Sequence, residues 1–153
     1  MKLLIVSDSH GRPDSIERAV ERESPDCLVH LGDGWRDAER VQAQFPSLPM
    51  EQVPGNCDIG RWESAERLCF LGGHALFLCH GHTLGVKQGL LRATLAAKER
   101  GAEVLLFGHT HQPMLDLHNG LWLMNPGSIG AFRATYGVIT LDERGIRPAL
   151  FDL

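Results

Sequence analysis

The sequence of 153 residues predicts an α/β fold in which two packed sheets are flanked by helices. Its first third alternates short apolar runs with amphipathic segments, a pattern typical of parallel strands joined by right-handed helical crossovers. Its later part contains pairs of apolar runs separated by turn residues, which predict β-hairpins. Five of the apolar runs end in Asp, Asn or His, mostly next to glycine. Because sites in open α/β sheets form beyond the strand ends on one edge, these polar residues predict a site there.

The first third of the chain is expected to hold three strands and two helices. The strands are expected at residues 2–7, 27–31 and 49–53. Pro13 suits the first turn of a helix over residues 13–23, in which Ile16 begins an apolar face with i, i+3, i+4 spacing. A second helix is expected over residues 35–45 and ends before Pro46. This order predicts a parallel βαβαβ start.

The rest of the chain is expected to be mostly β with one helix. The strands are expected at residues 67–71, 74–79, 103–107, 114–118, 121–124, 136–141 and 146–151. Gly72-Gly73 and Asn119-Gly120 each join two of these runs, and Asn-Gly is the type I′ turn signal. The longest helix is expected from Val86 to Arg100, with Gly101 as its C-cap.

Composition excludes several classes of protein. Apolar residues make up 43% of the chain, so a single globular domain over residues 1–153 is expected. The net charge of −4 and the pI near 6.0 argue against a broad nucleic-acid-binding face. The four cysteines form no Cys-x-x-Cys pair and are expected to be reduced thiols in a cytoplasmic protein. The first apolar run is too short for a signal peptide and no run approaches transmembrane length, so no membrane partner is expected.

Seven side chains with metal-ligating atoms follow the expected strand ends. They are Asp8, His10, Asp33, Asn56, His80, His109 and His111. In extended backbone the i, i+2 spacing of His109 and His111 would put both imidazoles on one side. Carboxylate, amide and imidazole together suit Mn²⁺, Fe²⁺, Zn²⁺, Co²⁺ or Ni²⁺. Seven ligands are too many for one catalytic ion that keeps an open position, but suit two ions bridged by a carboxylate, for which Asp33 is the natural choice. Such a pair of ions favours phosphoester hydrolysis.

The motifs around these side chains resemble the calcineurin-like metallophosphoesterase superfamily. That family carries D-x-H, G-D, G-N-x-D/E, an H before a small residue, and G-H-x-H, in this order. The matching segments are Asp8-Ser-His10, Gly32-Asp33, Gly55-Asn56-Cys57-Asp58, His80-Gly81-His82 and Gly108-His109-Thr110-His111. A further segment, Asn125-Pro-Gly-Ser128, resembles the small bacterial and archaeal phosphodiesterase branch.

The resemblance implies a fold and a metal content. It implies a four-layer α/β sandwich of two mixed sheets, with a dimetal site at the carboxyl ends of the strands. One ion is expected on Asp8, His10, Asp33 and His111, and the second on Asp33, Asn56, His80 and His109. Two divalent transition-metal ions are therefore expected as cofactors, with Mn²⁺ as first choice and Fe, Zn, Ni or Co as alternatives.

The function predicted from the ligand set and the resemblance is that of a phosphodiesterase. It would hydrolyse a small-molecule phosphoester by in-line attack of a metal-bridging hydroxide. The gaps between motifs leave no room for a cap domain, so an open and weakly selective site is expected. A protein-binding scaffold is the alternative, as in the retromer subunit with this fold, which has lost the bridging acid that Asp33 supplies here. A nuclease is disfavoured by the acidic charge balance. The natural substrate and any self-association into a homo-oligomer are left open.

Three further residues are candidates for a role in catalysis, namely Cys57, Asp58 and His82. Many relatives have His at the place of Cys57, where it is thought to protonate the leaving group. A thiol is a poor general acid for an alkoxide, so we expect a preference for good leaving groups, with acid help from water or His82. Asp58 is expected to orient a neighbouring group.

Other polar and aromatic residues have simpler interpretations. As isolated residues Asp8 and Asp33 could each be a helix N-cap, an interpretation that the set of seven outweighs. Ordinary surface or strand positions are expected for His30, His74 and His118. Arg61, Trp62 and Arg133 could line a substrate pocket, but solvated loop positions are the expectation for them.

Overall fold

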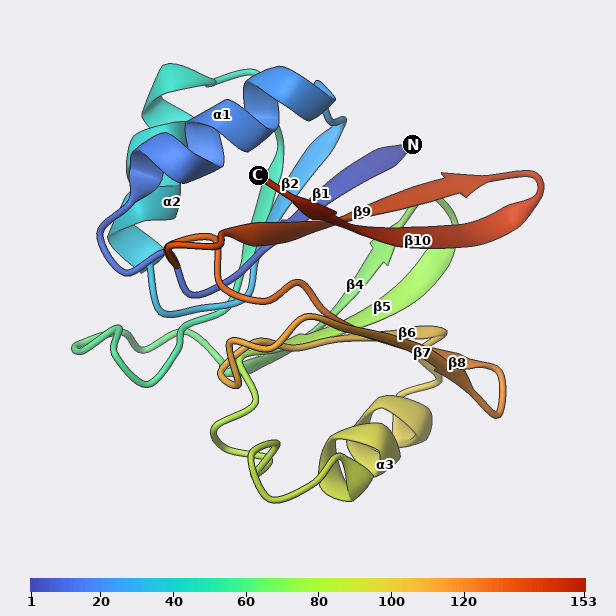
Figure 1. Ribbon diagram of the computed structural model, residues 1–153. Helices are drawn as coiled ribbons and strands as arrows, with labels where there is room; N and C mark the ends of the chain where they lie inside the picture. Colours follow the sequence, from blue (N-terminus) through green and yellow to red (C-terminus); the bar gives the residue numbers. More distant parts are fainter.

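The computed structural model describes residues 1–153 and contains ten strands and three helices. They are arranged in four layers, with helices outside and two five-stranded sheets inside (Figure 1). The predicted α/β sandwich of two mixed sheets is therefore confirmed. None of the three helices is long and apolar enough to cross a membrane.

The first sheet, sheet A, contains both ends of the chain. Its strands, in the order β10-β9-β1-β2-β3, are Gly145–Asp152, Thr135–Asp142, Lys2–Val6, Cys27–His30 and Met50–Gln52. The strands β1, β2 and β3 are parallel, whereas β9 is antiparallel to both β1 and β10. The expected parallel start of the fold is confirmed, and β1 lies at the centre of the sheet.

The second sheet, sheet B, is built from the middle of the chain. Its strands, in the order β4-β5-β6-β8-β7, are Glu66–Leu71, His74–Cys79, Val104–Leu106, Leu121–Asn125 and Met114–His118. Both predicted hairpins are present. Asn119 and Gly120 have φ angles of 50° and 78°, the left-handed pair that a type I′ turn requires.

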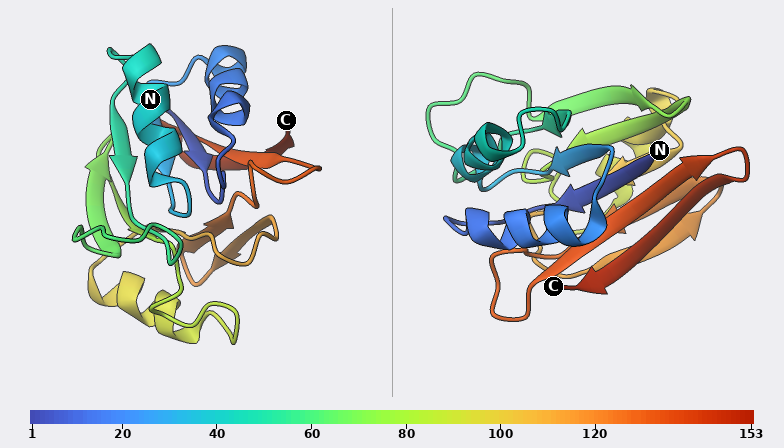
Figure 2. Two further views of the ribbon diagram at one scale, coloured as in Figure 1. Left: turned by 90° about the vertical axis from the view of Figure 1, so that its left-hand side faces the viewer. Right: turned by 90° about the horizontal axis from the view of Figure 1, so that it is seen from above.

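Two helices cover sheet A and one covers sheet B. The helices α1 (Pro13–Glu23) and α2 (Trp35–Gln44) lie side by side on the outer face of sheet A, and α3 (Leu91–Glu99) lies on the outer face of sheet B (Figure 2). The apolar face expected in α1 is buried against sheet A, with Ile16 fully buried. A separate apolar core fills the space between the two sheets.

The prediction for the third helix is wrong at its beginning. The expected helix from Val86 starts instead at Leu91, and with nine residues α3 is shorter than the eleven-residue α1. Gly85 and Gly89 interrupt the preceding segment, with φ angles of 65° and 149° that a right-handed helix does not accept. Val86 keeps the buried position that its apolar periodicity suggested, but in a turn.

Candidate metal centre

The seven expected ligands lie together on loops that follow the parallel strands. Sheet A supplies Asp8, His10, Asp33 and Asn56 from the loops after β1, β2 and β3, and sheet B supplies His80, His109 and His111 from the loops after β5 and β6. In Figure 1 the ends of β1, β2, β5 and β6 run to the left-hand side of the molecule. The structure thus brings the seven side chains to one place, and their roles as ligands stay predictions.

A first group of ligand atoms surrounds the carboxylate of Asp8. One ligand atom each from Asp8, His10 and His111 lies within 4.8 Å of the others. Asp8 is fully buried, and its Oδ2 accepts hydrogen bonds from the Ser7 hydroxyl at 2.5 Å and the His109 N–H at 3.1 Å. Its Oδ1 has no hydrogen-bond partner, although Nε2 of His111 lies 3.1 Å away. A buried carboxylate oxygen without a hydrogen bond is costly, and a cation between it and the ring nitrogens would satisfy it.

A second group forms around His80. One ligand atom each from Asp33, His80 and His109 lies within 4.8 Å of the others. Nδ1 of His80 lies 2.7 Å from the Leu31 carbonyl oxygen and therefore carries the proton in the neutral ring. The Nε2 lone pair then faces two oxygens, Oδ1 of Asn56 at 3.1 Å and Oδ2 of Asp33 at 3.4 Å. A second proton or a metal ion can occupy such a position, and the carbonyl behind the ring orients it as in other metal sites.

Asp33 lies between the two groups. Its Oδ2 is 3.4 Å from Nε2 of His80 and 4.0 Å from Nε2 of His10, while Oδ1 accepts the Cys57 N–H at 2.7 Å. Burial raises the pKa of Asp33, but hydrogen bonds with His80 and with the Cys57 N–H outweigh burial and hold the pKa well below its usual range. The carboxylate is therefore ionised at neutral pH. Gly55 permits this approach, because a Cβ at that position would lie 2.1 Å from Asp33 Oδ1.

The electrostatic environment of His80 differs from that of its neighbours. Burial disfavours the charged ring, but the Asp33 hydrogen bond and the Asp8 charge outweigh it and raise the pKa of His80. Burial, together with the charge on His80, lowers the pKa of His109. Because ligands must be deprotonated to bind a metal, protons compete with a cation more strongly at His80 than at His109.

Five of the seven expected ligands have left-handed backbone conformations. The φ angles are 56° for Asp8, 45° for His10, 57° for Asp33, 66° for His109 and 59° for His111. Residues other than glycine seldom adopt this region, which costs about 1–3 kcal/mol each and is concentrated at functional sites. The expectation of extended backbone at His109 and His111 is therefore wrong. The two rings lie in different groups, as the family resemblance implied.

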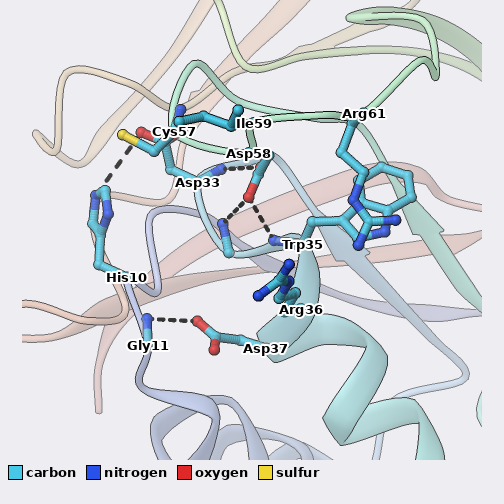
Figure 3. Close-up of a pocket in the computed structure, with 11 residues that line it drawn as sticks. His10, Gly11, Asp33, Trp35, Arg36, Asp37, Cys57, Asp58, Ile59 and Arg61 are labelled. Atoms are coloured by element: carbon cyan, nitrogen blue, oxygen red, sulfur yellow. Dashed lines mark hydrogen bonds and ion pairs between the residues drawn. The ribbon is translucent and has the colours of Figure 1, made fainter.

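Asp58 connects two of the ligand-bearing loops. Its Oδ2 accepts the N–H groups of Asp33 and Gly55, both at 2.8 Å. Its Oδ1 accepts those of Gly34 at 3.1 Å and Trp35 at 2.9 Å, and Figure 3 shows Asp58 beside Asp33 and Trp35. The carboxylate thus holds the loop after β2, the loop after β3 and the first turn of α2 together. No side chain of the loop itself caps α2, so the interpretation of Asp33 as an N-cap is wrong. The same holds for Asp8, since α1 begins after Arg12 without a side-chain cap.

A buried hydrogen-bond chain beneath the centre was missed from the sequence. The Gly32 N–H donates to Nδ1 of His30 at 3.2 Å, and Nε2 of His30 lies 3.2 Å from the Ser9 hydroxyl, which donates to Asp37 at 2.6 Å. Asp37 also accepts the Gly11 N–H at 2.8 Å. His30 is fully buried, and burial lowers its pKa to about 4, so the ring is neutral. Each of its two ring nitrogens has a hydrogen-bond partner.

His30 lies at the end of strand β2, as expected of a strand histidine, but its ring is buried and hydrogen-bonded and does not lie at the surface. These hydrogen bonds join the residues on either side of His10 to the loop that carries Asp33. The only signal in the sequence was the position of a serine between two ligands, since the partners of His30 come from separate segments.

Comparison with known proteins identifies the family. The calcineurin-like phosphoesterase superfamily domain matches residues 1–144. The chain belongs to the calcineurin-like phosphoesterase superfamily. Among curated members, the probable metallophosphoesterase YsnB of Bacillus subtilis is 33% identical over 99% of this chain and 91% of its own. The phosphodiesterase YfcE of Escherichia coli is 29% identical over 93% of this chain and 89% of its own.

The fold is shared with a solved structure outside these enzymes. Vps29 from Entamoeba histolytica, complexed with Zn²⁺, superposes with a TM-score of 0.78 over 99% of each chain. At 16% identity this likeness shows the fold alone. The expected membership of the calcineurin-like phosphoesterase superfamily and the fold class are thus confirmed together.

Two of the candidate catalytic residues, Cys57 and His82, lie beside the expected metal ligands. Cys57 is exposed, and its thiol can approach His10 and Asp33 to within 4.8 Å. The Asp33 carboxylate as hydrogen-bond acceptor, together with burial, raises the pKa of Cys57, so the thiol stays protonated at neutral pH. The ring of His82 lies 5.5 Å from that of His80, and its Nδ1 has no partner. Burial and the His80 charge lower the pKa of His82.

A pocket of about 390 Å³ opens beside the centre (Figure 3). His10, Asp33 and Cys57 line it on the side of the centre, and Trp35, Arg36 and Arg61 are among the residues that line the rest. Of the two interpretations of Arg61, the structure supports the one that places it at a pocket, and its guanidinium carbon lies 5.0 Å from the centre of the Trp35 ring. Trp62 remains 97% exposed, in line with the expectation for that position.

Proposed function

We propose that this phosphoesterase is a metal-dependent phosphodiesterase that hydrolyses small-molecule phosphoesters. The observation that carries the proposal is the buried Oδ1 of Asp8, which lacks a hydrogen bond and faces the ring nitrogens of His10 and His111. A buried carboxylate oxygen that accepts no hydrogen bond and faces two ring nitrogens is well suited to bind a cation.

The residues would hold two cations in the groups described above. Asp8, His10 and His111 would hold one, His80, His109 and Asn56 the other, and the Asp33 carboxylate lies where it could contact both. Two divalent cations bound there would acidify a shared water and neutralise negative charge on a phosphate group. Mn²⁺ is the first choice for this mixture of oxygen and imidazole ligands, with Fe, Zn, Ni and Co as alternatives.

Residues around the centre orient the expected ligands and leave the centre open to solvent. Leu31 orients His80 through its carbonyl oxygen, and Asp58 fixes the backbone that carries Asp33. The side chains of His10 and His111 are 37% and 48% exposed, so a phosphate group can reach the centre from solvent. No segment covers this opening in the way that a cap domain would, which supports broad rather than narrow selectivity.

The centre lacks a strong general acid that could protonate a leaving group. The raised pKa of Cys57 and the lowered pKa of His82 leave a weakly acidic thiol and a mostly neutral imidazole beside the centre. Neither is a strong general acid near pH 7. We therefore expect aryl diesters, whose leaving groups need no proton, to react faster than alkyl esters. The name of YfcE, a phosphodiesterase similar over most of this chain, supports a diester over a monoester.

A protein-binding scaffold is the second candidate function. The likeness to Vps29 favours it, since that fold is shared over nearly the whole chain. Against it stands the complete set of seven metal-ligating side chains, including the buried Asp33. The two functions differ in a measurable way, because only the enzyme needs metal-dependent turnover.

The test is a metal-reconstitution experiment. Protein stripped with a chelator is loaded with Mn²⁺, its metal content is measured by elemental analysis, and bis(4-nitrophenyl) phosphate is compared with 4-nitrophenyl phosphate and alkyl monoesters. We expect about two ions per chain and the fastest turnover with the aryl diester. Absence of turnover with Mn²⁺ and with each alternative metal would favour the scaffold. If the protein binds metal but hydrolyses none of the esters, the metal has a structural role and the proposed activity is refuted.

A further inference from the structure

The pocket beside the centre is continuous with it. His10, Asp33 and Cys57 line both, so a molecule with its phosphate at the centre could extend one substituent into the pocket (Figure 3). A volume of about 390 Å³ is sufficient for a small substituent but not for a large polymer. The chemistry of the remaining lining therefore indicates which substituent fits.

The acidic side chains of the pocket are already engaged. Asp58 accepts four backbone N–H groups, and Asp37 accepts the Ser9 hydroxyl and the Gly11 N–H. Asp33 belongs to the centre itself. Arg36, in contrast, is exposed and forms neither an ion pair nor a side-chain hydrogen bond. The hydrogen-bonding groups that remain available to a ligand in the pocket are therefore guanidinium N–H donors.

A second guanidinium is held in a fixed position at the far side of the pocket. Arg61 stacks on the Trp35 ring, and its Nη2 lies 3.3 Å from Oε2 of Glu39. Glu39 in turn accepts the Trp35 indole N–H at 2.8 Å, so the three side chains support one another. Stacking and one ion pair leave other N–H groups of the guanidinium free. A pre-organised arginine of this kind suits the planar, bidentate recognition of phosphate or carboxylate.

We infer that the pocket lined by Arg36 and Arg61 binds a second anionic group, a phosphate or a carboxylate, carried on one arm of the phosphoester substrate. The inference rests on the proposed function and adds the substrate class to it. The scissile phosphate lies at the centre, and the charged end of the arm lies against the two guanidinium groups. The selectivity of the site then comes from this charge and not from a cap over the opening.

The test compares substrates that differ only at the end of one arm. We use 4-nitrophenyl phosphodiesters whose second arm is 2-phosphonooxyethyl, 2-carboxyethyl or the neutral 2-methoxyethyl, with Mn²⁺-loaded protein. We expect kcat/KM to be about a hundredfold higher for an anionic arm, because a charge-assisted hydrogen bond to each of the two guanidinium groups supplies about tenfold. The phosphate and carboxylate arms show which of the two anions is preferred.

Three variants connect that preference to the pocket. Arg36→Gln and Arg61→Gln should each lower kcat/KM more for the anionic arms than for the neutral arm, by about tenfold. The control is Arg40→Gln, which removes the same charge from the exposed surface of α2, one turn beyond Arg36 and outside the pocket. It should keep the full preference. Equal rates for charged and neutral arms in the unmodified protein, or an equal loss in all three variants, would overturn the inference.

A binding measurement separates this inference from the proposed activity. Dissociation constants for ethane-1,2-diyl bisphosphate and 2-hydroxyethyl phosphate are measured by calorimetry in the unmodified protein and in the Arg36→Gln and Arg40→Gln variants. If no diester is hydrolysed, the proposed activity fails, but tighter binding of the bisphosphate that is lost only in Arg36→Gln still supports the pocket. Equal affinity for the two ligands refutes the pocket, whatever the rates are.

Discussion

Replacing Asp58 with Asn tests whether one carboxylate holds the loops of the centre in place. The two carboxylate oxygens accept four backbone N–H groups, from Asp33, Gly34, Trp35 and Gly55, at 2.8–3.1 Å. An amide has the same shape but only one acceptor oxygen. Its NH₂ group would face two N–H donors, so two hydrogen bonds would be lost and their donors would repel the new group.

The expected loss of stability follows from that count. Each backbone N–H left without a partner costs about 1–3 kcal/mol, and values toward the lower end apply because Asp58 is only half-buried. The two remaining bonds also lose their ionic component. We expect the free energy of unfolding to fall by about 2–4 kcal/mol, which for a chain of this size lowers Tm by about 5–15 °C. Affinity for metal should fall too, because Asp33 and Asn56 lie on the loosened loops.

Urea unfolding of the metal-free protein and elemental analysis of the Mn²⁺-loaded protein measure both effects. The matched control is Asp116→Asn, which removes the same charge from an exposed carboxylate that accepts only the adjacent Leu117 N–H. The control should stay within about 0.5 kcal/mol of the unmodified protein. A similarly small change for Asp58→Asn, with full metal content, would show that the four hydrogen bonds do not determine the loop positions.

Three further predictions concern other parts of the centre. Asp33→Asn should lose at least one of two bound ions and lower kcat by several orders of magnitude, because a neutral amide bridges two cations poorly; two retained ions with near-normal turnover would contradict this. Burial lowers the pKa of His30 to about 4, so between about pH 6.5 and pH 4 the unfolded chain binds a proton that the folded protein does not. The free energy of unfolding should therefore fall as pH decreases through that window, by up to about 3 kcal/mol, and an unchanged slope in His30→Gln urea titrations would exclude His30 as the cause. Gly34→Ala would place a Cβ 1.8 Å from the Ser9 hydroxyl oxygen and should destabilise the protein by about 1–3 kcal/mol. Adding Ser9→Ala should recover part of that loss in denaturant unfolding, whereas strictly additive losses would show that the two positions do not clash.

The parts of the fold that local sequence determines were predictable. The helix Pro13–Glu23 has its proline in the first turn and an apolar face at helical spacing, and its predicted limits are confirmed. The hairpin of β4 and β5 was also predictable, because Gly72 and Gly73 can both adopt the positive φ angles that a two-residue turn between antiparallel strands requires. The start of α3 was not predictable from apolar spacing, because Val86 is buried from a turn and not from a helix.

The candidate centre was predictable in membership but not in geometry. Parallel strands bring their carboxyl ends to one edge, so polar residues after β1, β2 and β3 must lie near one another. The left-handed backbone at His109 and His111 depends on contacts between loops, as does the burial of His30. Such contacts join segments far apart in the chain, and no local pattern carries them. The hydrogen bond between Ser9 and Asp37 is another such contact, since the two residues are 28 positions apart in the sequence.

The division of ligands between the two sheets has a consequence for the whole molecule. Both carboxylates stand on loops of sheet A, whereas three of the four imidazoles stand on loops of sheet B. A bound cation would therefore cross-link the sheets at the open end of the core between them. By thermodynamic linkage, metal affinity and the docking of the sheets must then depend on each other. Loading with metal should slow amide hydrogen exchange in strands of sheet B that touch no ion, and a cavity made by Leu76→Ala in the core between the sheets should weaken metal binding from a distance.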